Sequence, residues 1–201
     1  MRAEFKPVRE LFAKTGTQFE VPGYQRGYEW GQKERRDLWL DVQRIGEEVD
    51  QHYLGNIILL KTDSAGRVYE IVDGQQRITT LTLLVMAIRD TKPFQNDTDI
   101  DRRIEEVISA YPQGDEERRL RLNDQENDEN LRHIWRRAPD ETRGNIRDTY
   151  NYFQNRLQGL EEHEVQSLLN NILDRLRVVE TTCRDTSLAY TVFQSQNERG
   201  K

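Results

Sequence analysis

The segment Asp73–Arg77, DGQQR, places a carboxylate, two side-chain amides and a guanidinium in five consecutive residues. It follows residues 70–72, which suit a buried strand, and Asp-Gly is typical of a tight turn. Apolar residues then recur at helical spacing over residues 78–88, so we expect a helix to begin near Gln75. The first amides of such a helix point outward, where the helix dipole favours an anion. Arg77, one turn in, can hold a phosphate through two parallel hydrogen bonds.

The same segment has a purely structural alternative. Asp73 and Gly74 can act only as a helix cap and a tight turn, and Arg77 can be a solvated residue of the first turn. Support for a phosphate site therefore has to come from other parts of the chain.

A second segment, Phe19–Trp30, has the sequence FEVPGYQRGYEW. Its first three residues alternate as in a strand, which Pro-Gly ends, and the residues after it could contact a DNA backbone or stack on bases. For Tyr28 and Trp30 we favour core packing, whereas Gln25 and Arg26, polar and beside a turn, favour a functional role. The candidate DNA-binding residues are Tyr24, Gln25, Arg26, Tyr28 and Trp30.

Four segments occur in an order and spacing that resemble a known family. They are VPGYQRGYEW (21–30), YLGNIILL (53–60), YEIVDGQQRITTLTLL (69–84) and VFQSQNERGK (192–201). They resemble the N-terminal, ParB/sulfiredoxin-like domain of GmrSD-type, modification-dependent restriction enzymes and related phage-defence proteins. The resemblance covers essentially the whole chain, and the combination of YQR with DGQQR-x-TT is highly specific.

The resemblance implies a domain that binds and hydrolyses a nucleoside triphosphate of unspecified base. The catalytic residues that it implies are Asp73, Gln76 and Arg77. The nucleotide-binding and phosphate-binding residues that it implies are Gly74, Gln75, Gln76, Arg77, Thr79 and Thr80. Asp73 could also hold Mg²⁺ through a phosphate, although a single carboxylate is its only support. Asn197 and Arg199, in the last segment, are further candidate site residues.

The resemblance also implies partners, namely foreign or modified DNA and a C-terminal or separate nuclease domain, often of the HNH type. The chain itself contains no nuclease motif. A helix-stop pattern at residues 197–200 precedes a segment that the family pattern continues, so we expect the chain to be truncated at its C-terminus. Leu188, Val192 and Phe193 would then be incompletely covered, and the domain could form a homo-oligomer.

Composition excludes several classes of protein. The net charge of −6 rules out a uniformly basic surface, so contact with DNA must come from a local patch. The start of the chain lacks a signal-peptide core and the longest apolar run is too short for a membrane span, which predicts a cytoplasmic location. Cys183 is the single cysteine, and the three histidines have no metal-ligand spacing, so no metal site is expected in the chain itself.

The pattern of apolar residues predicts an α+β fold, with a small mixed sheet and a large α-helical lobe, and the resemblance implies that the sheet is of the ParB/sulfiredoxin-like type. We expect residues 1–90 to form the DGQQR core and residues 91–201 the lobe, with a returning strand near 177–182. The other expected strands are 19–21, 53–60 and 69–72, and we expect strands 53–60 and 69–72 to form a hairpin. A short extended piece is expected at 120–122. The expected helices are 8–13, 33–49, a helix from 75, 100–111 stopped by Pro112, one around 131–135, 146–160, 165–176 and 188–194.

Three functions remain open at this point. The first is a nucleotide-binding, NTP-hydrolysing regulatory domain that also senses DNA. The second is a DNA-binding module that senses modified DNA without turnover, and the third is a non-catalytic scaffold for a nuclease domain. Arg26 and Arg77 both follow strand ends, where sheet proteins concentrate their binding groups, so we expect them to meet in one cleft.

Overall fold

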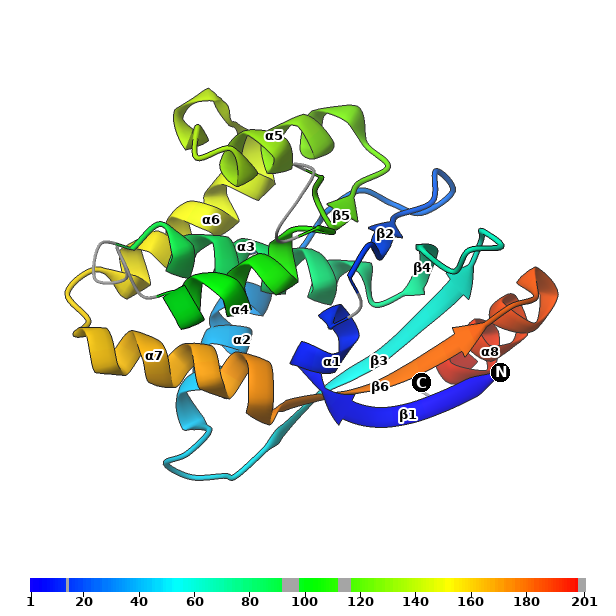
Figure 1. The fold of residues 1–201 in the computed structure, drawn as a ribbon, viewed down its shortest axis with the longest axis horizontal. Coiled ribbons are helices and arrows are strands. Elements are labelled where there is room, and N and C mark those ends of the chain that lie inside the picture. Colours follow the sequence, from blue (N-terminus) through cyan, green and yellow to red (C-terminus); the bar gives the residue numbers. More distant parts are fainter. Residues whose placement is uncertain (14, 92–97, 112–116, 199–201) are drawn as a thin grey trace.

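A mixed sheet with helices on both faces makes up the computed structural model, which describes residues 1–201 except 14, 92–97, 112–116 and 199–201 (Figure 1). The strands are β1 Arg2–Pro7, β2 Gln18–Glu20, β3 His52–Lys61, β4 Val68–Asp73, β5 Leu120–Arg121 and β6 Leu176–Cys183. The helices are α1 Val8–Phe12, α2 Gln32–Arg44, α3 Gln75–Arg89, α4 Thr98–Ile108, α5 Gln125–Trp135, α6 Gly144–Leu157, α7 Glu162–Asn170 and α8 Thr186–Glu198. A 3₁₀ turn, Pro139–Glu141, and a π-helical segment, Asn171–Arg175, complete the described elements. The predicted α+β class is confirmed.

The strands of the described residues are ordered β1-β6-β3-β4-β2-β5. β3 and β4 form the predicted antiparallel hairpin, and the returning strand β6 lies between β1 and β3. Sequence analysis did not predict β1, because its alternating charged residues resemble a solvated segment. Lys6 of β1 forms a buried ion pair with Glu180 of β6, which joins the first strand of the described chain to the last. The division into residues 1–90 and 91–201 stays a prediction.

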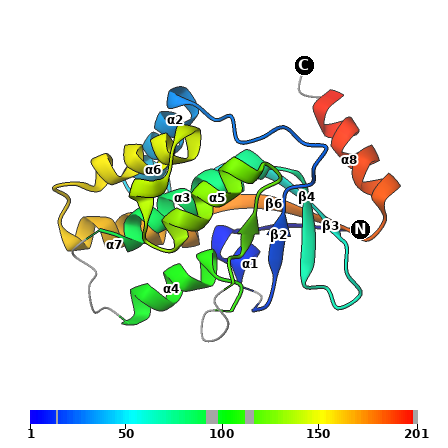
Figure 2. The ribbon, with the colours of Figure 1, turned by 90° about the horizontal axis from the view of Figure 1, so that it is seen from above.

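Helix α3 runs through the centre of the molecule, between the sheet and the other helices (Figures 1 and 2). It begins at Gln75, as predicted, and every residue in it except Arg77 is buried. The buried hydroxyls of Thr80 and Thr82 donate hydrogen bonds to backbone carbonyls one turn earlier in the same helix. Arg77 is consequently the one side chain of α3 that extends toward solvent.

Helix α8 lies on the other face of the sheet, apart from the remaining helices (Figure 2). It packs on a small apolar cluster that is separate from the main core. Leu188 is 38% exposed, and Val192 and Phe193 are only partly buried on this cluster. The predicted incomplete cover of these three residues is confirmed. The cluster consists of Ile58, Leu60, Val72, Cys183 and Ala189.

Several predicted helices were too long. The helix predicted over 33–49 ends at Arg44, because Ile45 is extended and Gly46 adopts a φ of +90°, so Val49 is 43% exposed rather than on a helix face. Likewise α4 ends at Ile108, where the backbone pairs with the segment before β5.

Two further helix ends were also wrong, and one predicted stop cannot be placed. Helix α6 ends before Leu160, which follows a glycine with positive φ, and the helix after it gives way to β6 at Leu176. The predicted stop at Pro112 lies outside the described residues. Within the part of the chain that is described, no helix has the length and apolar character needed to span a membrane.

Candidate functional site

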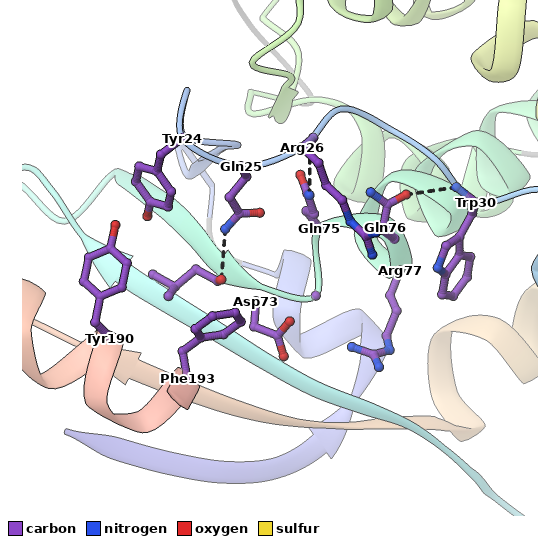
Figure 3. A pocket seen from close by; sticks show the side chains of 12 residues that line it. Tyr24, Gln25, Arg26, Trp30, Asp73, Gln75, Gln76, Arg77, Tyr190 and Phe193 are labelled. Carbon is purple, nitrogen blue, oxygen red and sulfur yellow. Dashed lines mark hydrogen bonds between the residues drawn. The ribbon is translucent and has the colours of Figure 1, made fainter. Parts of the chain in front are cut away.

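A cleft of about 600 Å³ lies where the loop after β2, the β4–α3 turn and helix α8 meet (Figure 3). Arg26 and Arg77 both line it, which confirms that the two sequence motifs share one cleft. Its wall consists of Tyr24, Gln25, Arg26, Trp30, Val72, Asp73, Gly74, Gln75, Gln76, Arg77, Tyr190 and Phe193.

The side chain of Gln76 holds the loop that carries the first motif. Its Oε1 accepts hydrogen bonds from the amides of Glu29 (2.9 Å) and Trp30 (3.1 Å), and its Nε2 donates to the carbonyl of Gly27 (2.9 Å). These three bonds occupy the side-chain amide of Gln76, a buried residue that is 8% exposed. Gln76 therefore positions the loop, and its predicted catalytic role stays untested.

Two more glutamines fasten the same loop to the strand–turn–helix unit. Gln75 donates from Nε2 to the carbonyl of Arg26 at 2.9 Å. Gln25 donates from Nε2 to the carbonyls of Ile71 (2.6 Å) and Val72 (2.9 Å) at the end of β4. Both amides thus bond to the protein backbone, so the motifs YQR and DGQQR hold each other in place.

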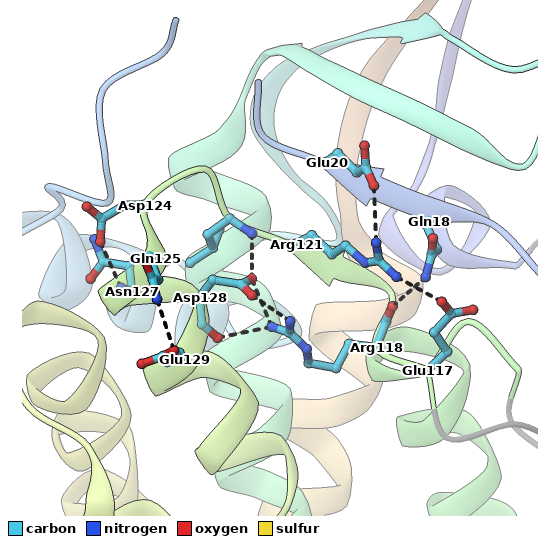
Figure 4. Close-up of polar contacts among 11 residues, drawn as sticks. Gln18, Glu20, Glu117, Arg118, Arg121, Asp124, Gln125, Asn127, Asp128 and Glu129 are labelled. Carbon is cyan, nitrogen blue, oxygen red and sulfur yellow. Dashed lines mark hydrogen bonds and ion pairs between the residues drawn. The ribbon is translucent and has the colours of Figure 1, made fainter. Parts of the chain in front are cut away.

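The outer side of the loop rests on the segment around β5. Asn123 donates from Nδ2 to the carbonyls of Pro22 and Gln25. This segment is itself fixed by a two-pronged ion pair between Arg118 and Asp128, in which the carboxylate also accepts the amide of Leu122 (Figure 4). The helical lobe therefore holds the outer side of the loop. Asn123 is a positioning residue that sequence analysis missed.

The start of α3 is shaped by Gly74, which has a φ of +93° and no side chain that could cap the helix. A Cβ at Gly74 would lie 2.3 Å from Cδ1 of Ile57, so only glycine fits. The first bond inside the helix runs from the amide of Ile78 to the carbonyl of Gly74. The amides of residues 75–77 precede this bond and form the positive end of the helix dipole.

Arg77 crosses β3 at a glycine. Its Nη1 donates to the carbonyl of Asn56 at 3.2 Å, and its Nε and Cζ lie within 2.9 Å of where a Cβ of Gly55 would be. The register of β3 shifts between Tyr53 and Gly55, and Gly55 has a φ of +132°. The group that lies close to Gly55 is therefore the guanidinium of Arg77.

Asp73 is the carboxylate of the cleft, and it is partly buried at the end of β4. Burial raises the pKa of its carboxyl above the ordinary value of 3.8, while the charge of Arg77 and a hydrogen bond from the amide of Gly74 oppose the rise. At the polar end of the cleft, a carboxyl group with a raised pKa therefore lies beside a guanidinium and a helix N-terminus.

The opposite end of the cleft is aromatic (Figure 3). The rings of Tyr24 and Tyr190 lie 5.6 Å apart, and Phe193 lies beside them, one helical turn from Tyr190. Burial, together with a hydrogen bond to Tyr190, raises the pKa of the Tyr24 phenol well above its usual range. Sequence analysis assigned no site role to Tyr190 and Phe193, although their i, i+3 spacing places them on one face of α8.

Arg26 is the most accessible cation of the cleft. Its side chain is 68% exposed and pairs at 2.8 Å with Glu29, whose side chain is 55% exposed. Such an exposed pair contributes little to stability, so an incoming anion can replace the carboxylate.

Some predicted site residues lie away from the cleft. Tyr28 is 7% exposed and its hydroxyl bonds to those of Thr80 and Thr149, so the favoured alternative of core packing describes its position, and the ring cannot reach DNA. Thr79 and Thr80 are also buried, which leaves their hydroxyls no access to a phosphate. The side chain of Asn197 and the whole of Arg199 lie outside the described residues.

A metal site made by the protein alone is not present in the described part of the chain, where no three His, Cys, Asp or Glu side chains come together. His52 lies 3.3 Å from Asp41 and His133 lies 3.0 Å from Glu141, in separate pairs. A divalent cation at the cleft would need oxygen ligands from a bound phosphate in addition to Asp73.

The family assignment rests on a match over most of the chain. The sequence profile described as "GmrSD restriction endonuclease, N-terminal domain" matches residues 8–201, which include all four motif segments and everything after β1. A comparison with curated proteins gives no match. The chain therefore belongs to the family of N-terminal domains of GmrSD restriction endonucleases.

Proposed function

We propose that the cleft binds a nucleoside triphosphate. The observation that carries the proposal is the meeting of two guanidinium groups and the N-terminus of α3 at one end of a cleft whose other end is aromatic. Phosphates bind at helix N-termini and to arginine forks, and a base stacks on aromatic rings. The volume of about 600 Å³ is within the range of small-molecule sites.

In this proposal each end of the cleft has its own task. The amides of residues 75–77 and the guanidinium of Arg77 hold the phosphates, and Arg26 exchanges Glu29 for a terminal phosphate oxygen. Tyr190 and Phe193 receive the base. The glutamine side chains contribute by holding the loop and the helix at a constant distance, which reduces the entropy lost when the nucleotide binds.

Hydrolysis would use the few charged groups that remain available. Arg77 can stabilise the charge that develops on the transferred phosphoryl group, and Asp73 can orient a water molecule or, with phosphate oxygens, hold Mg²⁺. A Mg²⁺ ion would supply further neutralisation of phosphate charge when bound. The carboxylate and the guanidinium suit this chemistry, because a hard cation takes oxygen ligands and a phosphate takes a planar fork.

We further propose that nucleotide turnover regulates a DNA-cleaving partner in a restriction or phage-defence system. The family name supports this role, since a restriction endonuclease cuts DNA and the domain described here is its N-terminal part. The catalytic nuclease would then lie in another domain or another chain.

The test is calorimetric titration of the wild type, Arg77→Ala and Arg77→Lys with each of the four nucleoside triphosphates. Loss of a charge-assisted bidentate contact should weaken binding roughly 10- to 100-fold, and lysine should restore little because it lacks the planar fork. Arg36→Ala is the control, since Arg36 is an exposed arginine of α2 outside the cleft. Equal affinities for all four proteins would refute the phosphate site.

Phosphate release with Mg²⁺, measured with and without DNA, separates the remaining functions. Steady release that Arg77→Ala abolishes supports an NTPase. Binding of modified DNA without release supports a DNA sensor, and the absence of both supports a scaffold. Arg26→Ala should weaken DNA engagement more than nucleotide binding, because Arg26 is the exposed cation at the rim.

A further inference from the structure

Two large aromatic side chains are exposed on the same face of the sheet as helix α8. Phe5 of β1 is 61% exposed and Tyr53 of β3 is 50% exposed. In the strand register, Phe5 lies opposite Val179 and Tyr53 lies opposite Arg177. Val179 and Arg177 alternate along β6 with residues of the main core. The side chains of Phe5 and Tyr53 therefore point away from the main core. The two rings are 6.3 Å apart at 45°, too far from parallel to be stacked on each other.

An arginine of β6, the strand between β1 and β3, lies over one of the two rings. The guanidinium carbon of Arg177 is 5.9 Å from the centre of the Phe5 ring, and its Nε donates to Oε1 of Gln51 at 3.0 Å. Its terminal N–H groups have no partner among the described residues. We call Phe5, Tyr53 and Arg177 the open-face patch.

The open-face patch is continuous with the cleft. The hydroxyl of Tyr53 donates to the side chain of Asn56, and the carbonyl of Asn56 accepts a hydrogen bond from Arg77. In Figure 3 the strands β3, β6 and β1 follow one another below the cleft, beyond Asp73 and Arg77. A chain that leaves the cleft past Arg77 would therefore run onto the patch.

We propose that the open-face patch binds single-stranded DNA. Exposed rings on the two strands that flank β6, with a guanidinium of β6 beside them, can stack on unpaired bases and neutralise the phosphate next to them. A duplex hides the faces of its bases, so it cannot use the rings in this way. The restriction-enzyme family of the chain favours DNA as the polymer. This site differs from the DNA contact predicted at residues 24–30, where several side chains are committed to internal bonds.

Charge supports this choice of partner. Two arginines lie on this path, Arg177 over the Phe5 ring and Arg77 in the cleft, and Asp73 is the carboxylate near Arg77, whose ionisation burial disfavours. The acidic partner of β1, Glu180, points to the other face, where Lys6 neutralises it. The two guanidinium groups are therefore local positive charges on a chain whose net charge is −6.

The test is fluorescence anisotropy of a labelled oligothymidine of roughly 12 nucleotides, a length typical of one single-strand-binding domain. Phe5→Ala and Tyr53→Ala should each weaken binding roughly 5- to 100-fold, whereas Phe5→Tyr and Tyr53→Phe should retain it because a ring remains. Arg177→Gln should reduce the slope of log affinity against log salt by about 0.7, the value for one phosphate contact on a single strand.

The control is Leu40→Ala, which removes an exposed apolar side chain of α2 away from the sheet and should leave binding unchanged. All replaced side chains are at least partly exposed, and thermal melts check that each variant folds. The proposal is overturned if the oligonucleotide does not bind, if the alanine variants bind like the wild type, or if duplex DNA or single-stranded RNA binds more tightly. A change of molecular mass in light scattering on Phe5→Ala would instead assign the patch to self-association and also overturn it.

The proposal does not rest on nucleotide binding in the cleft. Phe5→Ala should leave the nucleotide affinity measured by calorimetry within about 2-fold of the wild type, since Phe5 does not line the cleft. Failure of either proposal is therefore visible without the other.

Discussion

At the scale of single residues, the two glutamines of DGQQR use their side chains for hydrogen bonds to another part of the protein. Gln75 and Gln76 bond to the backbone of residues 26–30, and Gln25 bonds back to β4. A short polar motif thus combines two tasks, since Gly74 and Arg77 line the cleft while the glutamine side chains hold the loop of residues 26–30.

Replacement of Gln76 tests this positioning role. Gln76→Ala removes three hydrogen bonds and leaves two partly buried amides without a partner, so it should lower the free energy of unfolding by about 2 to 4 kcal/mol. Urea denaturation measures the change. Gln32→Ala, at an exposed position of α2, should change stability by less than about 0.5 kcal/mol. Similar small effects of both substitutions would show that the loop does not depend on Gln76.

Asp73 should make stability depend on pH. Because burial raises the pKa of its carboxyl in the folded state above the ordinary value of 3.8, the folded protein binds a proton more tightly than the unfolded chain. The contribution of Asp73 is therefore fully favourable below that ordinary value and is lost as pH rises through the raised pKa. Asp73→Asn should remove this loss.

Thermal melts of the wild type and Asp73→Asn between pH 4 and 8 measure the effect. The melting temperature of the variant relative to the wild type should rise with pH and then level off. A difference that is constant, or that falls with pH, contradicts a raised pKa.

At the scale of elements, the irregularity of β3 at Gly55 makes room for Arg77. Gly55→Ala puts a Cβ 2.8 Å from Nε of Arg77 and forces a φ of +132° on an L-residue. The backbone strain should cost about 1 to 3 kcal/mol in stability. The displaced guanidinium should also weaken nucleotide binding by as much as Arg77→Ala does.

Gly23→Ala is the matched control for Gly55→Ala, because a Cβ at Gly23 meets nothing within 4 Å. Urea denaturation and nucleotide titration of both glycine variants complete the comparison. Unchanged nucleotide affinity in a folded Gly55→Ala protein would mean that Arg77 acts from another position.

Helix α8 is the element that completes the cleft with Tyr190 and Phe193 while packing on a cluster separate from the main core. Its attachment to the sheet is therefore weaker than that of α3, which is buried along its length. A nucleotide that bridges α3 and α8 should slow amide hydrogen exchange in α8 more than in α3, and equal slowing in both helices would contradict this role.

At the scale of the whole molecule, the first and last strands of the described chain are neighbours in the sheet. β6 pairs with β1 on one side and with β3 on the other, and Lys6 and Glu180 bury their charges between β1 and β6. A fragment of residues 1–90 would lack β6 and would leave the facing edges of β1 and β3 unpaired.

We therefore expect the fragment 1–90 to be unfolded, although the sequence suggested it as a core. Circular dichroism should show no cooperative melt, whereas the full chain should melt in one transition. A cooperative transition in the isolated fragment would establish residues 1–90 as an independent domain.

The sequence alone was sufficient where the determining interactions are local. The strand, turn and helix around DGQQR, the start of α3 at Gln75 and the hairpin of β3 and β4 follow from periodicity and from Asp-Gly turn chemistry. The family also followed from the motifs and their order, and the profile match confirms it. Several helix ends did not follow from periodicity, because positive-φ glycines such as Gly46 and pairing with distant segments end the helices earlier.

Only the tertiary structure decided which of these residues face the cleft. The hydrogen bond that joins Gln76 to Trp30 spans 46 positions in the chain, and the one that joins Tyr28 to Thr149 spans 121. Residue type cannot distinguish an amide that faces a ligand from one that bonds to a loop, since both are polar groups beside a turn. The arrangement of α8 over β3 and β4, and of β6 beside β1, is a matter of long-range packing, and it is this packing that adds Tyr190 and Phe193 to the cleft.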